Sequence, residues 1–169
     1  VNGFTVNQNQ NTTIWYGCTY MGVLAIIDLN LKNPSDQLSI GGNIIIKDSI
    51  IESYRIEFTG SAGGYSQLYY RTHLIAHELF EFNAAPIQFI NCNLIQSNGC
   101  NGDHDYGFLI NEPIEMIFTN SIILYGYNDP CSVHDNPFHI DYWQNEQTDI
   151  YIFTSVLNFE QPEFTYQLA

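Results

Sequence analysis

The feature that most constrains the fold of this chain is a recurring pattern of short, continuously apolar runs. Four segments share a polar lead-in, an apolar run, a small or polar pair and a second apolar run: GGNIIIKDSIIES (41–53), AAPIQFINCNLIQS (84–97), NEPIEMIFTNSIILY (111–125) and QTDIYIFTSVLNF (147–159). VLAIIDLNLKN (23–33) is a looser fifth copy. Apolar runs punctuated by Gly, Asn, Pro and Asp, without long amphipathic helical stretches, predict an all-β protein.

One such unit cannot bury its own apolar side, so the copies indicate stacked turns of a coil with parallel strands along its axis. Continuously apolar runs are typical of buried parallel strands, whereas sandwich strands usually alternate. The sequence therefore predicts a single domain, residues 1–169, that folds as a parallel β-helix of about five to six rungs. A β-sandwich or jelly roll is the alternative.

The anchors that align the copies are Ile46, Ile90, Phe118 and Phe153. They are unequally spaced along the chain, and the first gap is the longest. Because repeats of this kind accept insertions in their loops, that gap predicts either one rung with an insertion or two short rungs.

A family resemblance rests on three of these segments. IQFINCNLIQSNG (87–99) and IEMIFTNSIILYG (114–126) resemble the Phe-x-Asn-Cys and Phe-x-Asn-Ser repeats of pectin-lyase-like right-handed parallel β-helices, above all of surface-protein members. GGNI (41–44) is similar to their Gly-Gly-x-Ile element. The resemblance implies a right-handed coil. The Asn-Thr-Asp, Asp-Asp and Gly-His-Gly elements of polygalacturonases are not found, so it does not imply their activity.

The net charge of the chain argues against two classes of binding partner. Lys32, Lys47, Arg55 and Arg71 are the only basic residues besides histidine, against 18 acidic residues, and the formal net charge is -14. Nucleic-acid binding requires a cationic surface, and anionic membranes attract basic segments, so neither partner fits. A cation or a neutral, polar polymer fits better.

The cysteines and one triplet indicate an extracellular protein. Cys18, Cys92, Cys100 and Cys131 are an even number, and none lies in Cys-x-x-Cys spacing. Asn11 begins an Asn-Thr-Thr glycosylation triplet. The chain begins Val-Asn-Gly, which suggests a mature form or a fragment of a larger extracellular protein. Repeat alignment predicts a Cys100–Cys131 bridge between successive rungs; a local Cys92–Cys100 pair or four free thiols remain open.

The segment HELFE (77–81) is one residue away from the His-Glu-x-x-His motif of zinc proteases, because Glu81 replaces the second histidine. A helix carrying His77 and Glu78 is one interpretation. The β surroundings favour a strand over 74–82 instead. In that strand one face would carry Leu74, Ala76, Phe80 and Phe82, with Glu78 as the misfit.

Two polar loops are candidate metal sites. NGDHDYG (101–107) contains Asp103 and Asp105, and NDPCSVHDNPFHID (128–141) contains Asp135. Carboxylates in loops suit Ca²⁺, and a pair of them also suits glycoside hydrolysis. The plain alternative is that Asp, Asn and Gly serve the turns, with no cofactor.

Aromatic residues provide a third candidate site, because Tyr125, Tyr127 and Tyr142 lie in or near polar loops and exposed tyrosines stack on sugars. The sequence as a whole predicts a non-catalytic, extracellular structural or adhesive module of a surface protein, filament or virion fibre. A carbohydrate-active lyase or hydrolase on the same fold and a sugar-binding β-sandwich are the alternatives. Open coil ends predict self-association or neighbouring domains of a longer chain.

Overall fold

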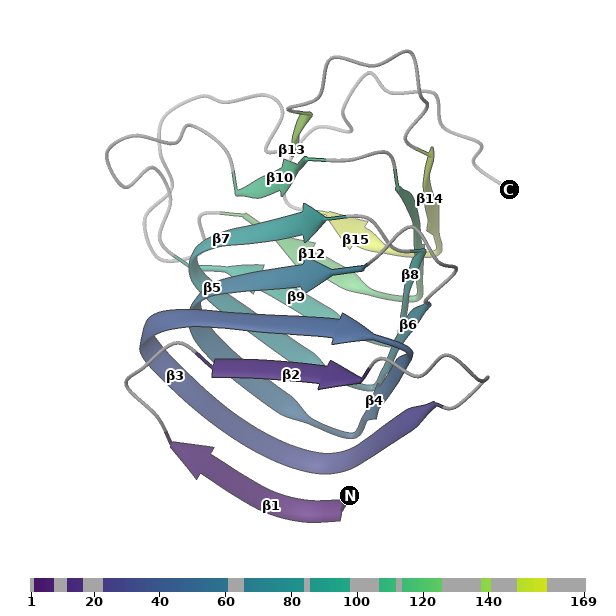
Figure 1. The fold of residues 1–169 in the computed structure, drawn as a ribbon. Coiled ribbons are helices and arrows are strands. Elements are labelled where there is room, and N and C mark those ends of the chain that lie inside the picture. The colour runs from purple at the N-terminus through teal and green to yellow at the C-terminus, as the bar shows by residue number, and fades with distance from the viewer. Residues whose placement is uncertain are drawn as a thin grey trace.

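The computed structural model describes residues 2–7, 12–16, 23–60, 66–83, 86–97, 107–111, 114–125, 138–140 and 149–157. Over these residues the chain is all-β and forms one 15-stranded sheet in which every strand pair is parallel. The sheet coils around a core, as Figure 1 shows. The predicted parallel β-helix is confirmed, and the β-sandwich alternative is wrong because its strands would pair largely antiparallel. No helix in the described part is long and apolar enough to cross a membrane.

Each rung contributes to three faces, which we call A, B and C in chain order. Face A contains residues 24–27 of β3 (Leu24–Gly42), β4 (Ile44–Lys47), β6 (Gln67–Tyr70), β8 (Ile87–Ile90), β11 (Glu115–Thr119) and β14 (Asp149–Phe153). Face B contains residues 30–33 of β3, 50–53 of β5 (Ile50–Thr59), 73–76 of β7 (His73–Asn83), β9 (Asn93–Gln96), β12 (Ile122–Leu124) and β15 (Val156–Leu157).

Face C contains β2 (Thr12–Tyr16), residues 37–41 of β3, 55–59 of β5, 79–83 of β7, β10 (Phe108–Ile110) and β13 (Phe138–Ile140). β1 (Asn2–Asn7) pairs with β3 across the bend between faces A and B. The long strands β3, β5 and β7 pass from one face to the next without a loop (Figure 1).

The bend from face A to face B is built the same way in every described rung. One residue adopts a positive φ, from 48° to 57°, and the six residues that do so are Asp28, Asp48, Arg71, Asn91, Asn120 and Thr154. Asn and Asp tolerate this left-handed conformation better than other non-glycine residues. The small polar pairs of the sequence pattern therefore mark the corners of the coil.

At three corners, the serine that follows the positive-φ residue links successive rungs. The hydroxyl of Ser121 accepts a hydrogen bond from the Cys92 amide at 3.1 Å, and that of Ser155 accepts one from the Ser121 amide at 3.1 Å. Ser49 does the same for the Leu29 amide at 3.1 Å. A buried backbone N–H that the bend removes from the sheet needs such a partner. The result is a ladder of small polar side chains along the inside of the corner.

In the core, side chains at equivalent positions of successive rungs stack on one another. On face A the rings of Tyr69, Phe89 and Phe118 lie one above the next, with centroids 5.1 and 5.0 Å apart and nearly parallel planes. The hydroxyl of Tyr69 donates to Gln67 Oε1 at 2.8 Å, and the Gln67 amide donates to the carbonyl of Thr59 at 2.8 Å. Burial raises the pKa of Tyr69 well above its usual value. The apolar stack therefore also satisfies its buried polar groups.

The register corrects the sequence alignment by one residue. Phe118 lies opposite Phe89 rather than Ile90, and it lies opposite Ile152 rather than Phe153. The long first gap is two short rungs, with Tyr69 between Ile46 and Phe89. Successive corners are 20, 23, 20, 29 and 34 residues apart. A slip of one residue exchanges the two faces of a strand, so the misaligned anchors point away from the core.

The HELFE segment is a strand, as the β surroundings predict. It lies in β7, and its inward residues Leu74, Ala76, Phe80 and Phe82 are buried. The pairing of β5 with β7 shifts by one residue between faces B and C, where His77 and Glu78 form the bend. The bend explains why Glu78 breaks the alternation, and it removes the helix on which a zinc-protease motif depends.

Candidate ligand-binding face

Most of the residues that the sequence singled out lie outside the described residues. These are Asn11, Cys100, Asp103, Asp105, Tyr127, Cys131, Asp135 and Tyr142. The Ca²⁺ site, the Cys100–Cys131 bridge, the glycosylation site and two of the three predicted sugar-stacking tyrosines therefore stay predictions. Among the described residues, no group of three or more His, Cys, Asp or Glu is arranged to hold a metal ion.

Besides His77 and Glu78, the structure describes two further residues that the sequence singled out, Tyr125 and Cys92. Tyr125 is half-buried and packs against the core. A β-carbon on Gly107 would lie 2.5 Å from Cδ2 of Tyr125, so the ring rests directly on this glycine. Cys92 is a buried free thiol in the structure, and Cys100 lies outside the described residues, so the pairing of the cysteines stays a prediction. Burial raises the pKa of Cys92 to about 11, so its thiol packs in the corner without reactivity at neutral pH.

The densest polar network lies on face C, around two glutamates that sequence reasoning did not select. Glu57 of β5 lies directly opposite Glu81 of β7 in the sheet. Gln37 Nε2 donates to Glu57 Oε2 at 2.7 Å, and the hydroxyl of Ser39 donates to the same oxygen. Asn83 Nδ2 donates to Glu57 Oε1 at 2.8 Å. The Glu57 carboxylate is thus held from three sides.

Glu81 is held in a similar way by side chains of its own strand and of both neighbouring rungs. Asn111 Nδ2 donates to Glu81 Oε1 at 2.7 Å and to Asn83 Oδ1 at 2.8 Å. Asn83 Nδ2 also lies 3.3 Å from Glu81 Oε1. Arg55 Nη1 lies 3.6 Å from Glu81 Oε2. Amides and one guanidinium therefore offset the repulsion between the two neighbouring carboxylates.

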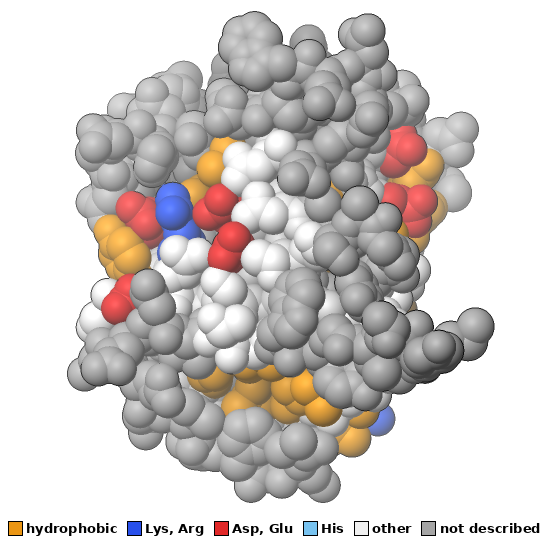
Figure 2. Space-filling model, viewed as in Figure 1, with side chains coloured by type: hydrophobic (Ala, Val, Ile, Leu, Met, Phe, Trp, Pro, Cys, Tyr) orange, Lys and Arg blue, Asp and Glu red, His pale blue; other side chains and the backbone are white. Residues whose placement is uncertain are grey.

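The network continues toward the bend from face B to face C. Arg55 Nε lies 3.7 Å from Glu78 Oε2, and the Tyr54 hydroxyl donates to Glu78 Oε1 at 3.3 Å. The negative charge of Glu78 raises the pKa of Tyr54. Figure 2 shows acidic side chains beside a basic one on the side of the molecule that faces the viewer. The carboxylates are only partly exposed, since the side chain of Glu78 is 21% exposed and that of Glu81 is 15% exposed.

A second series of contacts links four successive rungs along the same bend. Lys32 Nζ lies 3.2 Å from Glu52 Oε2, His77 Nε2 lies 3.1 Å from Glu52 Oε1, and His77 Nδ1 lies 2.8 Å from the Ser97 hydroxyl. Burial would raise the pKa of Glu52, but the hydrogen bonds and charges of Lys32 and His77 outweigh it and lower this pKa.

A serine bound to a histidine that is oriented by a carboxylate is also the arrangement of a nucleophilic catalyst. Ser97 is only 3% exposed, and its amide donates to the carbonyl of Ala76 within the sheet. A substrate carbonyl cannot approach a hydroxyl in that position. The contacts therefore connect rungs and do not activate a nucleophile.

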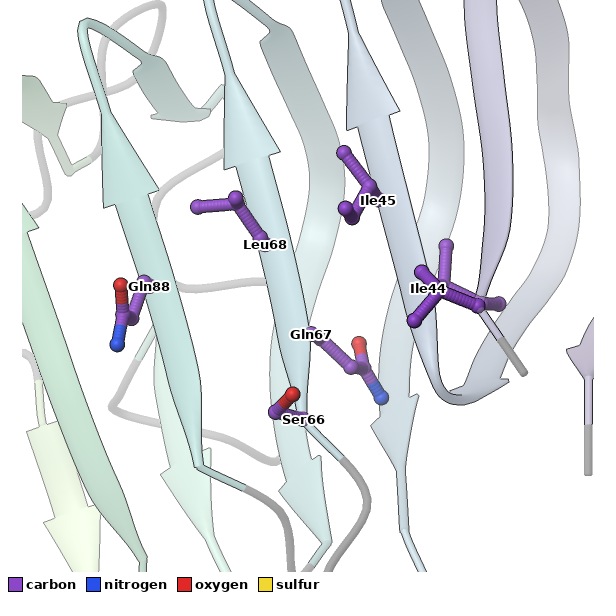
Figure 3. A pocket seen from close by; sticks show the side chains of 7 residues that line it. Ile44, Ile45, Ser66, Gln67, Leu68 and Gln88 are labelled. Carbon is purple, nitrogen blue, oxygen red and sulfur yellow. The ribbon is translucent and has the colours of Figure 1, made fainter. Parts of the chain in front are cut away.

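A shallow hollow lies on face A, where Ile45, Leu68 and Gln88 occupy neighbouring strands in one row. Figure 3 shows these side chains side by side, with Ser66 near the entrance to β6. Its lining is mainly aliphatic and holds no charged side chain. Because the hollow has no charged side chain and few hydrogen-bonding groups, face C is the stronger candidate binding site.

Comparisons with known proteins identify no relative of this chain: no family model, no curated protein and no solved structure matches it. The resemblance to pectin-lyase-like repeats therefore stays a prediction.

Proposed function

We propose that this chain is a non-catalytic, extracellular structural or adhesive module of a surface protein, filament or virion fibre, and that face C binds a neutral carbohydrate. The observation that carries the proposal is the Glu57–Glu81 network. Hydrogen bonds hold two carboxylates and the amides of Gln37, Asn83 and Asn111 together on face C, where all five side chains are partly exposed. Carboxylate and amide groups are suitable acceptors and donors for the hydroxyl groups of sugars.

The preformed contacts favour binding because they hold the side chains in place before a ligand arrives. Immobilising a flexible polar side chain at an interface costs about 0.5–1.5 kcal/mol. Asn83 and Asn111 already contact each other and the two glutamates, so little of this cost remains. The same side chains retain hydrogen-bonding capacity toward solvent, since each carboxylate oxygen accepts more than one hydrogen bond.

Charge decides between classes of polymer. The chain carries a formal net charge of -14, and Glu57, Glu78 and Glu81 outnumber Arg55 at the site. An anionic polysaccharide would be repelled both by the site and by the whole chain. A neutral polysaccharide avoids this repulsion and uses the same hydrogen-bonding groups.

A stacked coil also suits a structural role. The corner ladder and the aromatic stack repeat from rung to rung, so the faces extend along the coil axis in fixed register. Each rung contacts its neighbours in the same way, and this architecture gives extended binding surfaces. Such a module can hold face C at a set position on a cell, filament or virion.

Affinity electrophoresis of the whole chain in gels containing neutral glucans, mannans or xylans tests the proposal. We expect the wild-type chain to be retarded by at least one neutral polymer and by none of the anionic ones. The double variant Glu57→Gln with Asn83→Ala should lose at least about tenfold in affinity, roughly 1.4 kcal/mol. The matched control is Glu115→Gln, an exposed glutamate on face A. Equal loss in both variants, or none in either, would refute face C as the site.

An enzyme acting on carbohydrate is the second candidate, because two carboxylates lie close together on face C. Asn83 Nδ2 lies 2.8 Å from one carboxylate oxygen of Glu57 and 3.3 Å from one of Glu81. Those oxygens are therefore closer than the roughly 6.5–9.5 Å that separates the carboxyl groups of inverting glycosidases. A hydrolase that used this pair would therefore not have the inverting geometry. We expect no release of reducing ends or unsaturated products; release that Glu57→Gln abolishes would favour the enzyme.

A further inference from the structure

The bend between faces B and C carries a tyrosine and an ion pair at the border of face C. In β5 the bend consists of Tyr54 alone, because the pairing with β7 shifts between Ser53 and Arg55. In β7 the bend consists of His77 and Glu78. Extra residues at such a break in register re-aim the side chains next to it. Tyr54 and Glu78 meet there, and the Tyr54 hydroxyl donates to Glu78 Oε1 at 3.3 Å.

The ring of Tyr54 is partly exposed and is anchored through its hydroxyl group. The negative charge of Glu78 raises the pKa of Tyr54, so the hydroxyl stays protonated and keeps its bond to the carboxylate. Among the described residues, no other aromatic ring packs against Tyr54. A tyrosine held in this way offers a rigid apolar surface, because only two side-chain torsions need to be fixed. Such a surface suits stacking against a sugar ring.

Arg55 follows Tyr54 in β5 and joins the bend to face C. Its guanidinium contacts both Glu78 and Glu81, with nitrogen–oxygen distances of 3.7 and 3.6 Å. Both distances are too long for close hydrogen bonds, and the buried Nε of Arg55 has no hydrogen-bond partner in the described part of the chain. Glu57, by contrast, already accepts hydrogen bonds from three side chains. Arg55 and Glu78 therefore retain hydrogen-bonding capacity that Glu57 has largely used.

We propose that Tyr54, Arg55 and Glu78 form a second sugar position beside the Glu57–Asn83 position, so that face C binds two linked units of a neutral polysaccharide. The second position rests on the proposed function, because it serves the same polymer. Arg55 and Glu57 are two residues apart on one strand, and outward positions of a strand repeat every 6.6 Å or about that. This spacing leaves room for a separate ring over the bend.

Each group of the second position has a distinct task. The ring of Tyr54 stacks on the apolar face of the sugar, which orients the unit over the bend. The guanidinium of Arg55 donates to one hydroxyl oxygen, and the carboxylate of Glu78 accepts a hydrogen bond from the same or the neighbouring hydroxyl group. A donor beside an acceptor therefore matches a hydroxyl group, which both donates and accepts.

The charge balance of the second position favours a neutral unit over a uronic acid. Arg55 is shared by two carboxylates, those of Glu78 and Glu81. A uronic acid would bring a third carboxylate to one guanidinium and would be repelled by the other two. A hydroxyl group adds no charge, so it can bind between Arg55 and Glu78 without displacing either glutamate.

NMR titration of the whole chain with glucose, mannose and xylose, and with their disaccharides, tests the second position alongside retention in neutral polysaccharide gels. For the sugar of the polymer that retards the chain, we expect the disaccharide to bind at least about tenfold more tightly than the monosaccharide. Tyr54→Ala and Arg55→Gln should each remove most of this advantage and leave the affinity for the monosaccharide unchanged. Tyr54→Phe keeps the ring and should keep the advantage.

Tyr70→Ala is the matched control, because Tyr70 is a partly exposed tyrosine on face A and lies near Lys47 and Arg71. It should leave both affinities unchanged, and circular dichroism verifies that every variant is folded. A disaccharide advantage that survives in folded Tyr54→Ala and Arg55→Gln variants would overturn the second position and leave the Glu57–Asn83 position intact. Equal affinity of the wild-type chain for both sugars would do the same. A wild-type chain that no neutral polysaccharide gel retards would refute the proposed function and the second position together.

Discussion

Replacing Ser121 with alanine should destabilise the coil by removing one step of the corner ladder. The Ser121 hydroxyl is buried, accepts the Cys92 amide at 3.1 Å and donates to the carbonyl of Thr119, 3.0 Å away. Alanine fits the space but leaves the Cys92 amide buried without an acceptor. A buried donor that loses its partner costs about 1–3 kcal/mol, so we expect the free energy of unfolding to fall by about that amount.

Urea denaturation followed by far-ultraviolet circular dichroism measures this change, with the slope of the transition unchanged if only stability is affected. In a chain of this size, each kcal/mol lowers the melting temperature by about 2–4 °C. Ser121→Cys should restore much of the loss, because a cysteine already occupies the equivalent corner position at Cys92. Ser66→Ala, at an exposed serine, is the control and should stay within about 0.5 kcal/mol of wild type. A Ser121→Ala variant as stable as this control would refute the ladder as a source of stability.

Three further outcomes follow from the corner and the bend. Thr154→Asn should raise the free energy of unfolding by about 1 kcal/mol in thermal melts, because a β-branched residue is strained at φ 48° where Asn is tolerated; an unchanged melting temperature would contradict this. The Cys92 thiol should resist Ellman's reagent at pH 8 until the chain unfolds. Because its pKa is raised, the protonated thiol contributes to stability below pH 9.0, the ordinary pKa of the group, and this contribution is lost as the pH rises through about 11. Because the pKa of Glu52 is lowered, its carboxylate contributes to stability above pH 4.5, the ordinary pKa of the group, and this contribution is lost as the pH falls further. Glu52→Gln should therefore flatten the dependence of stability on pH in this acidic range. An unaltered pH dependence would argue against the contacts with Lys32 and His77.

The sequence pattern predicted the fold because its strongest signal came from the corner. A polar residue that tolerates positive φ followed by a small side chain recurs at Asp48, Asn91 and Asn120, each flanked by apolar strands. Only a coil with parallel strands uses the same corner repeatedly. The one-residue error at Ile90 arose because Phe89 and Ile90 are both apolar, and only cross-strand pairing shows which of them points inward.

The candidate site was harder to predict because its residues belong to the third face, which the repeat alignment left out. The signal was present as Glu57-Phe58-Thr59 and Glu81-Phe82-Asn83, where a buried phenylalanine lies between two outward polar residues. The second of these segments was missed because Glu81 is the last residue of HELFE, which was interpreted as a possible zinc-protease motif. A bend of one residue separates faces B and C in β5, so the buried positions change from odd to even numbers there, whereas the two-residue bend in β7 keeps them even and leaves Leu79 buried as well. Sequence periodicity alone cannot follow such a change of phase.

The central claim is that parallel, in-register rungs bring Glu57 and Glu81 together on face C. Cross-linking of the double variant Glu57→Cys with Glu81→Cys by a short bifunctional thiol reagent, followed by peptide mapping, tests it most directly. Residues opposite each other on neighbouring strands lie about 4.8 Å apart, within reach of such a linker. We predict a cross-linked peptide joining positions 57 and 81 in folded protein and little of it in urea. Folded protein in which both thiols react singly, with no 57–81 peptide, would contradict the register and with it the proposed site.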